Sequence, residues 1–446
     1  MRHLIKIFVL LMIPTCLWAQ VNAYFNQNPK SLYTEPYRGI TRPGDNLEEI
    51  LLNEIAQAEK FIYIAVQEIR LPKLAKLLVQ KKLAGVDVRI VLEHDYNSTI
   101  LNQKDAPEGE YEASKLSELW AFIDTNRDGK IDPTELDERD AVHILRQGNV
   151  PTIDDTFDQS SGSGLMHHKF VIIDGKKTIV STANFTMSCI HGDILSPMSR
   201  GNANSMVVVQ SGIFSKVFIE EFRQLWGNGK RGNFGQRKTY RGPQTLTVKG
   251  IKMTIQFSPT SQKYKWEESV NGLIGHEIKT ASRSVEAALF VFSDQNLADV
   301  LKAKRENEDL MVGAIIEPKF GYRDYSELLD LLGLQMLNSK CQYEAGNNPW
   351  SVPAQVAGLG ILPRGDVLHH KFAVIDRSKV VMGSQNWSDS ANYINDETLV
   401  VIEDTRISDL YGQEFDRLKK NYQEGPTGRL LKEIEKSENV CSRSGF

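Results

Sequence analysis

Two segments, one in each half of the chain, place a histidine two residues before a lysine. The first contains His167 and Lys169, and the second contains His369 and Lys371. Both segments are rich in Phe, Val and Ile, which favours a buried β-strand, and residues i and i+2 of a strand face the same side. Each segment therefore directs one imidazole and one ammonium group to the same face, while the histidine between them faces a packed layer.

These four side chains suit the cleavage of a phosphodiester. One histidine can attack phosphorus and form a covalent phosphohistidine, and the other can protonate the leaving oxygen and then activate water. Imidazole suits both roles because its pKa lies near neutrality. The two lysines would stabilise the negative charge that develops on the phosphoryl oxygens. The sequence does not indicate which histidine attacks.

The residues that follow each lysine also repeat. In both halves four residues separate the lysine from an aspartate, and six more precede a second element, Ser181-Thr-Ala-Asn184 or Gly383-Ser-Gln-Asn386. We expect the aspartates to orient the site by hydrogen bonding rather than to transfer protons; they are Asp174 and Asp376. Hydroxyl and amide groups can donate hydrogen bonds to phosphate. The residues expected to bind the substrate are therefore Thr182, Asn184, Ser384 and Asn386.

Amphipathic helices and buried strands alternate in the same order in the two halves. In the first half we expect a helix at 46–60, a strand at 61–66, a helix at 72–82 and a strand at 86–92. In the second half the matching elements are expected at 266–281, 285–292, 295–304 and 310–316. Alternation of this kind predicts an α/β fold in which helices flank a central mixed sheet.

The doubled pattern, His-x-Lys-x4-Asp followed by Gly-Ser-x-Asn, resembles that of the phospholipase D superfamily. The resemblance implies an α/β fold of two phospholipase-D-like halves, packed as a pseudo-dimer around one active site, so that a monomer contains a complete site. It also implies a phosphohistidine intermediate and no catalytic metal. The expected divisions are a first half at 24–226, a linker at 227–250 and a second half at 251–446. The first motif departs from the pattern at Ser181, where the family usually has glycine.

One acidic residue distinguishes the second half from the first. In related proteins a carboxylate at the position of Glu397 hydrogen-bonds the catalytic histidine, and the corresponding residue of the first half is Asn204. A carboxylate makes a neighbouring histidine more basic than an amide does. We therefore expect two unequal halves around one phosphate, with His369 supported by Glu397 and His167 without such support.

The favoured substrate is nucleic acid. The stretch Asn386-Trp-Ser-Asp-Ser-Ala-Asn-Tyr-Ile-Asn395-Asp-Glu397 resembles the endonuclease branch of the superfamily. The linker combines basic and aromatic residues that could follow a phosphate backbone and stack bases, unless it is a solvated Gly-rich connection. These residues are Lys230, Arg231, Phe234, Arg237, Lys238, Tyr240 and Arg241. The net charge of -4 argues against a generally basic coat but not against a local basic cleft.

A phospholipase D that hydrolyses phospholipid head groups is the alternative. It predicts exposed apolar loops near the site, for which the candidate is the segment 349–362, with Trp350, Val352 and Ile361. A non-enzymatic binding module is disfavoured because both motifs are intact.

An insert at about 108–146 carries a calcium-binding pattern that resembles an EF-hand loop. Gly129 occupies the sharp turn at position 6, and helices are expected on both sides, at 111–123 and 133–145. We expect the loop to hold a structural calcium ion, and the alternative is a solvated acidic turn. Oxygen ligands fall at positions 1, 3, 5, 9 and 12, with a backbone carbonyl at position 7: Asp124, Asn126, Asp128, Lys130, Asp132 and Glu135.

The N-terminus has the pattern of a signal peptide. Basic residues precede an apolar run at 7–18, which is too short to span a bilayer, and small residues follow at Ala19 and Ala23. We expect a leader at 1–23, with cleavage after one of these alanines. The mature protein would then be secreted or periplasmic, without a stable membrane span.

Three cysteines would remain after cleavage, in a compartment that permits disulfides. Cys341 and Cys441 are the favoured pair because both lie in the second half, which would leave Cys189 free. The alternative is three unpaired thiols.

Overall fold

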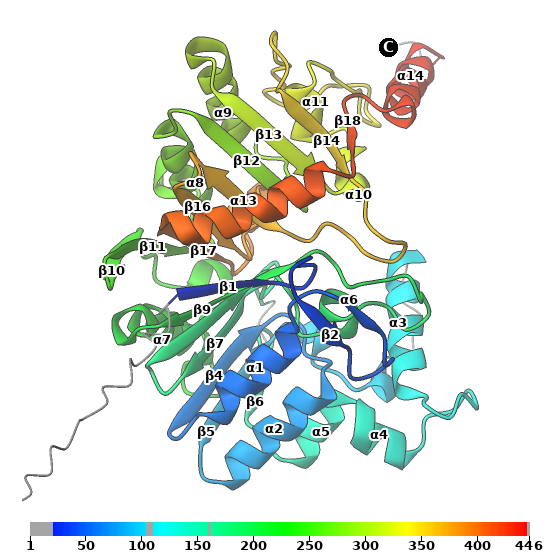
Figure 1. The fold of residues 1–446 in the computed structure, drawn as a ribbon, viewed down its shortest axis with the longest axis vertical. Helices are drawn as coiled ribbons and strands as arrows, with labels where there is room; N and C mark the ends of the chain where they lie inside the picture. The colour runs from blue at the N-terminus through cyan, green and yellow to red at the C-terminus, as the bar shows by residue number, and fades with distance from the viewer. Residues whose placement is uncertain (1–20, 104–109, 159–161, 444–446) are drawn as a thin grey trace, which may run out of the picture.

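The computed structural model describes residues 21–103, 110–158 and 162–443, which form two α/β halves stacked on one another (Figure 1). The first half is built on a seven-stranded sheet and the second on a nine-stranded sheet. The first sheet contains, in spatial order, β1 (Val21–Phe25), β9 (Ser205–Gln210), β8 (Lys177–Ser181), β7 (Lys169–Ile173), β4 (Phe61–Val66), β5 (Asp87–Leu92) and β6 (Thr152–Asp154). A separate hairpin pairs β2 (Leu32–Thr34) with β3 (Thr41–Pro43).

The second sheet repeats the central part of this order. It contains β10 (Gln244–Val248), β11 (Ile251–Phe257), β17 (Thr398–Glu403), β16 (Lys379–Gly383), β15 (Lys371–Ile375), β12 (Ser284–Leu289), β13 (Met311–Ile316), β14 (Val356–Gly360) and β18 (Tyr422–Glu424). In both sheets one parallel pair, β4–β5 or β12–β13, is extended by an antiparallel run, β7–β8–β9 or β15–β16–β17. The two-half α/β prediction is therefore confirmed.

Helices cover the outer faces of the sheets and also fill the space between them. The helices of the first half are α1 (Leu47–Ala56), α2 (Pro72–Leu83), α3 (Glu110–Ile123), α4 (Pro133–Arg139), α5 (Ala141–Gln147), α6 (Met187–Ile190) and α7 (Gly212–Trp226). Those of the second half are α8 (Val270–Lys279), α9 (Gln295–Glu308), α10 (Pro318–Gly321), α11 (Glu327–Leu331), α12 (Asp389–Tyr393), α13 (Thr405–Lys419) and α14 (Gly428–Arg443).

One apolar core joins the two halves. Helix α7 contributes Phe214 and Phe218 to it, and α13, which crosses the junction in Figure 1, contributes Tyr411 and Phe415. Burial of aromatic side chains of this size contributes strongly to the association of two surfaces. The shared core holds the two motifs in one fixed arrangement.

Two predicted helices differ from the structure at a capping residue. The helix expected at 133–145 is divided at Asp140, whose carboxylate accepts hydrogen bonds from the backbone N–H groups of Val142 and His143 and so begins α5. The helix expected at 266–281 begins only at Val270, because Ser269 caps α8 and a short 3₁₀ turn, Trp266–Glu268, precedes it.

The first half begins earlier than predicted. Strand β1 pairs with β9 from Val21 onward, and the Val21 side chain is fully buried. The predicted boundary at residue 23 falls inside this strand, whereas cleavage after Ala19 would leave it whole. The rest of the predicted leader, residues 1–20, lies outside the described residues. Within the described ranges no helix is long and apolar enough to cross a membrane.

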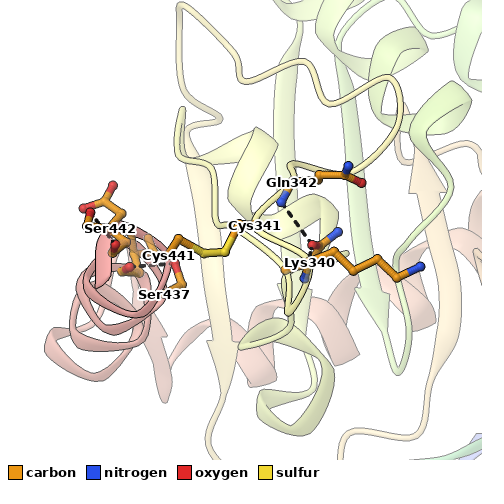
Figure 2. Close-up of a disulfide and its surroundings, with 9 residues drawn as sticks. Lys340, Cys341, Gln342, Ser437, Cys441 and Ser442 are labelled. Atoms are coloured by element: carbon orange, nitrogen blue, oxygen red, sulfur yellow. Dashed lines mark hydrogen bonds between the residues drawn. A yellow bond between two sulfur atoms is a disulfide. The ribbon is translucent and has the colours of Figure 1, made fainter. Parts of the chain in front are cut away.

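The C-terminal helix α14 is fastened to the second half by a disulfide. Cys341 and Cys441 are bonded, with their Cα atoms 5.5 Å apart, and Figure 2 shows this bond joining α14 to the loop around Gln342. Leu430 of α14 also packs against Leu329 and Met336. The favoured pairing is confirmed, and Cys189 is a buried free thiol.

Candidate active site

The two motifs meet at the junction of the halves, one at the start of β7 and the other at the start of β15. His167 and His369 each precede the first residue of their strand, and each is held by a backbone hydrogen bond from its own N–H to the opposite half: to Asp396 O at 2.9 Å and to Ala203 O at 3.1 Å. Both lysine side chains turn back, so that Lys169 Nζ and Lys371 Nζ donate to the carbonyl oxygens of the histidines two residues before them, at 2.7 and 2.8 Å.

Each of the two histidines is hydrogen-bonded by a side chain of the opposite half. His167 Nδ1 lies 2.7 Å from Glu397 Oε2, and His369 Nδ1 lies 2.9 Å from Asn204 Oδ1. The expectation that Glu397 supports His369 is therefore wrong, although the site is unequal as expected. The reason is the pseudo-dimer: the backbone of Met166 bridges to Asp396, and that of Leu368 bridges to Ala203, so each motif meets the other half's partner residue.

The tautomers of both rings follow from these partners. The amide Nδ2 of Asn204 donates to the carbonyl oxygens of Cys189 and Asn202, so its Oδ1 must accept the Nδ1 proton of His369. The carboxylate of Glu397 accepts the Nδ1 proton of His167 in the same way. Burial lowers the pKa of both histidines well below the usual range. Each neutral ring therefore keeps an unprotonated Nε2, which is the atom that nucleophilic attack requires.

Burial also shifts the charged groups of the site. It lowers the pKa of Lys169 to about 7, and it lowers that of Lys371 well below its usual range, helped by the neighbouring Lys169. Burial raises the pKa of Glu397 to about 7, against the opposing effect of Lys169. An anion between the two lysines would restore their charge, because an opposite charge within a few ångströms favours the ionised form.

Two of the predicted substrate ligands have a different role. Thr182 and Ser384 are fully buried. Thr182 Oγ1 donates to Asn204 Oδ1 at 2.8 Å, and the Ser384 hydroxyl hydrogen-bonds Glu397. They orient the partners of the histidines rather than face a substrate.

The two predicted amides remain at the site. Among the described residues, the buried Oδ1 atoms of Asn184 and Asn386 have no hydrogen-bond partner. Buried polar atoms are rarely left unpaired, and an amide oxygen only accepts, so these two atoms suit a hydrogen-bond donor such as a hydroxyl group or a water molecule.

Gln67, a residue that the sequence analysis missed, also contacts the site. Its Oε1 accepts hydrogen bonds from Lys169 Nζ at 3.3 Å and Asn184 Nδ2 at 3.1 Å. The equivalent residue of the second half is Phe290, whose ring lies 4.8 Å from that of His369 and 4.7 Å from Lys371 Nζ. Gln67 directly follows β4, and Phe290 directly follows β12. This matching position in the two halves is the sequence feature that could have pointed to these two residues.

Asp174 and Asp376 lie at the far ends of β7 and β15, in tight turns with positive φ. Asp174 accepts hydrogen bonds from three successive backbone N–H groups, those of Glu59, Lys60 and Phe61. Asp376 repeats the contact with the N–H groups at 282–284. Five strand residues span roughly 16 Å, so neither aspartate reaches the reacting groups, and both act by hydrogen bonding to the backbone, as expected.

Several basic side chains of the linker are paired with acidic residues and are not free to contact a substrate. Arg237 pairs with Asp158, and Arg241 pairs with Glu221. Lys238 is buried and lies 2.5 Å from Glu221 and 2.7 Å from Asp396. Three of the five predicted phosphate contacts are thus neutralised by acids, because the linker closes the junction between the halves instead of crossing its surface.

The loop 124–135, predicted to bind calcium, is folded back on its own acidic side chains. Asp124 accepts hydrogen bonds from the backbone N–H groups of Asp128 and Gly129, and Gly129 has a φ of 78°. Asp132 caps α4 together with Glu135. Calcium binding itself stays a prediction.

Two further groups of side chains lie close enough to hold a metal, within the described ranges. One joins His168, Glu221 and Asp396, and the ammonium of Lys238 already neutralises it. The other joins Glu93, His94 and Asp155.

A cavity of about 420 Å³ opens beside His369. It reaches from His369 and Asn184 to one face of α3, and the exposed loops at 193–202 and 365–367 form its rim. Charged residues of its wall include Glu68, Arg70, Lys115 and Glu118. Helix α3 precedes the calcium loop, so the insert supplies part of the catalytic cleft.

The profile of the family described as "Cardiolipin synthase, PLD-like domain" matches residues 51–226 and 274–419. Mitochondrial cardiolipin hydrolase of Homo sapiens is 29% identical over 149 residues, which are 33% of this chain and 58% of that protein. The Mus musculus protein is 29% identical over 136 residues, covering 29% of this chain and 61% of that protein. The chain thus matches about three fifths of the length of these relatives.

A solved structure adds evidence for the fold. Phosphatidylserine synthase of Haemophilus influenzae aligns with 95% of this chain and 92% of its own, with a TM-score of 0.54 and 10% identity. The family profile covers both halves of the chain and ends at α13. This chain belongs to the PLD-like family of the phospholipase D superfamily.

Proposed function

We propose that this phosphodiesterase hydrolyses phospholipids, with His167 as the nucleophile. The observation that carries the choice of substrate is the charge of the cleft. Its wall holds more carboxylates than cations: Glu68, Glu118, Asp193, Glu317 and Asp366 against Arg70, Lys115 and Lys319. Burial raises the pKa of Asp366 to about 6 and also raises the pKa of Glu118, Asp193 and Glu317, while Glu68 pairs with Arg70. Such a wall attracts a nucleic acid backbone weakly but accepts a compact head group attached to one phosphate.

The first chemical step forms the covalent intermediate. His167 Nε2 attacks phosphorus while the bond to the leaving oxygen breaks, and the ring becomes cationic. The Glu397 carboxylate at Nδ1 stabilises this cation, which the neutral amide of Asn204 could not do as well for His369. His369 Nε2, protonated once the substrate anion is bound, gives its proton to the leaving oxygen.

The second step reverses these roles. His369 Nε2 accepts a proton from water as the water oxygen attacks phosphorus, and the bond to His167 Nε2 breaks. Lys169 and Lys371 stabilise the phosphoryl oxygens in both steps, from a site with little water, where such contacts are strong.

The pH dependence of kcat/KM should be a narrow bell centred near pH 7. Below pH 7 Glu397 gains a proton and no longer stabilises the cationic ring, and above pH 7 Lys169 loses its charge. The Glu397→Gln variant should lose the acid limb along with most activity, whereas the exposed Glu59→Gln should keep the wild-type profile. An unchanged acid limb in Glu397→Gln would assign that limb to another group.

Nucleic acid is the second candidate substrate. Phe290, next to His369, packs edge-to-face on Phe320 with ring centroids 4.8 Å apart, and this aromatic pair could stack a base.

A substrate panel separates the two candidates. The protein would be incubated with phospholipid vesicles, plasmid, single-stranded DNA and RNA, with chelator present. We expect phospholipid hydrolysis that Lys169→Ala abolishes. Cleavage of DNA or RNA without phospholipid turnover would overturn the lipid proposal.

We also propose that the loop 124–135 binds calcium and stabilises the fold. Among the described residues none of Asp124, Asp128 and Asp132 forms an ion pair, so their charges remain for a cation. A ligand that binds only the folded state at 100 times its Kd stabilises it by about 2.7 kcal/mol. Calcium should therefore raise the melting temperature, and chelator should reverse the effect.

The variant Asp128→Asn tests the calcium loop specifically. An asparagine Oδ1 can still accept the hydrogen bond from the backbone N–H of Lys130, so the apo fold is preserved while one charge is lost. We expect a much smaller calcium-dependent rise in melting temperature than in the exposed control Glu138→Gln. Identical melting of the wild type with calcium and with chelator would exclude the site.

A further inference from the structure

Helix α3 separates two cavities. Its one face lines the catalytic cavity, and its opposite face lines an outer cavity of about 720 Å³. The outer cavity has an apolar wall and one polar end at the start of the calcium loop. The apolar wall consists of Leu116, Trp120, Ala121, Ile194 and Leu195, and the polar end includes Asp124 and Arg127.

The two cavities meet at the loop 193–200. Ile194 lines both of them, and Leu195 N donates to Glu118 Oε2 at 3.0 Å, which fastens the loop to α3. The outer cavity therefore lies on the other side of α3 from His369, with Ile194 in the walls of both cavities.

Large apolar side chains are exposed on the same rim. Leu195 is 59% exposed and Met198 is 63% exposed. Ile361, which is 58% exposed, belongs to the neighbouring loop of the second half. The two loops interlock, because Ser196 Oγ donates to Arg364 O and Asp366 accepts from the N–H of Arg200. Exposed apolar groups gathered on a rigid rim mark an interaction site.

We propose that the outer cavity binds an acyl chain of the phospholipid substrate, and that Leu195 and Met198 enter the surface of the bilayer. This inference rests on the proposed lipid activity and assigns its interfacial site. The charges agree with this occupant: Arg127 at the cavity mouth and Arg364 on the rim can contact lipid phosphates. Helix α3 of the insert thus provides one wall of each cavity, and the loop 193–200 provides the apolar rim.

The double variant Leu195→Asp/Met198→Asp tests the rim. It should lose vesicle binding and reduce the hydrolysis of vesicle phospholipid by about tenfold or more, since burial of two large apolar side chains is lost. Hydrolysis of bis(p-nitrophenyl) phosphate, a soluble diester without acyl chains, should be unchanged. The control is Leu83→Asp, because Leu83 is 77% exposed at the end of α2, outside both cavities.

Trp120 provides a second measurement that needs no loss of activity. Vesicles with brominated acyl chains should quench its fluorescence, taken as the difference between the wild type and Trp120→Phe. Vesicle hydrolysis that is equal in the wild type and the rim variant, or an unquenched Trp120, would overturn the acyl-chain site alone. A wild type that cleaves bis(p-nitrophenyl) phosphate but no phospholipid would overturn the lipid activity itself.

Discussion

With bis(p-nitrophenyl) phosphate, whose leaving group departs without protonation, the His369→Asn variant should accumulate a covalent p-nitrophenylphosphoryl group on His167, and the His167→Asn variant should form none. Both should lose turnover by about 10³-fold or more, because each removes a group that forms or breaks a bond in the reaction. The label should persist in His369→Asn, since without the second imidazole no base activates water. The acid-labile phosphoryl group on the peptide that contains His167 would be identified by mass spectrometry after a rapid quench.

The matched control for this experiment is His276→Asn, at an exposed position of α8. It should turn over like the wild type and carry no label. Labelling of His369 in the His167→Asn variant would reverse the assignment of nucleophile and acid. Equal labelling of both histidines in the wild type would show that the difference between Glu397 and Asn204 does not select between them.

Each histidine is hydrogen-bonded by a residue of the opposite half, Glu397 or Asn204. The sequence therefore could reveal the residues of the site but not which of them form hydrogen bonds with each other. Strand β4 lies where the apolar run at 61–66 predicted it, because a short buried run has one strong local preference. The partner of His167 is set by the packing of one half on the other. No local pattern distinguishes a carboxylate that supports its own half from one that supports the opposite half, and the natural assumption for a tandem repeat gave the wrong answer.

The same cause accounts for the errors at hydroxyl and basic residues. Thr182 and Ser384 occupy motif positions that suit phosphate, but the backbone turns their hydroxyls towards Asn204 and Glu397. In the sequence Arg237 and Lys238 suggest a basic surface, but in the structure acidic residues of other segments pair with both of them. The sequence gives the net charge of a segment, whereas its binding properties depend on which charged side chains remain unpaired after folding.

Lys238 is the basic residue whose pairing with buried acids should matter most for stability. Its Nζ donates to Glu221 and to Ser258 O, and lies 2.7 Å from Asp396 Oδ1. Although burial opposes it, the charges of Asp396 and Glu221 raise the pKa of Lys238. The backbone carbonyl of Asp396 also accepts the N–H of His167. One buried cation thus joins the linker, α7 and the segment that precedes β7.

The Lys238→Met variant should lower the free energy of unfolding by about 3–5 kcal/mol, because it leaves two buried carboxylates without their cation. Urea denaturation measures the loss, and the exposed Lys230→Met on the same linker should change stability by less than about 0.5 kcal/mol. Adding Asp396→Asn should recover part of the loss, since it removes one of the uncompensated charges while keeping an acceptor for the N–H of Gly235. Equal stability of Lys238→Met and Lys230→Met would mean that water reaches these carboxylates, and that the junction of the two halves does not depend on the ion pair.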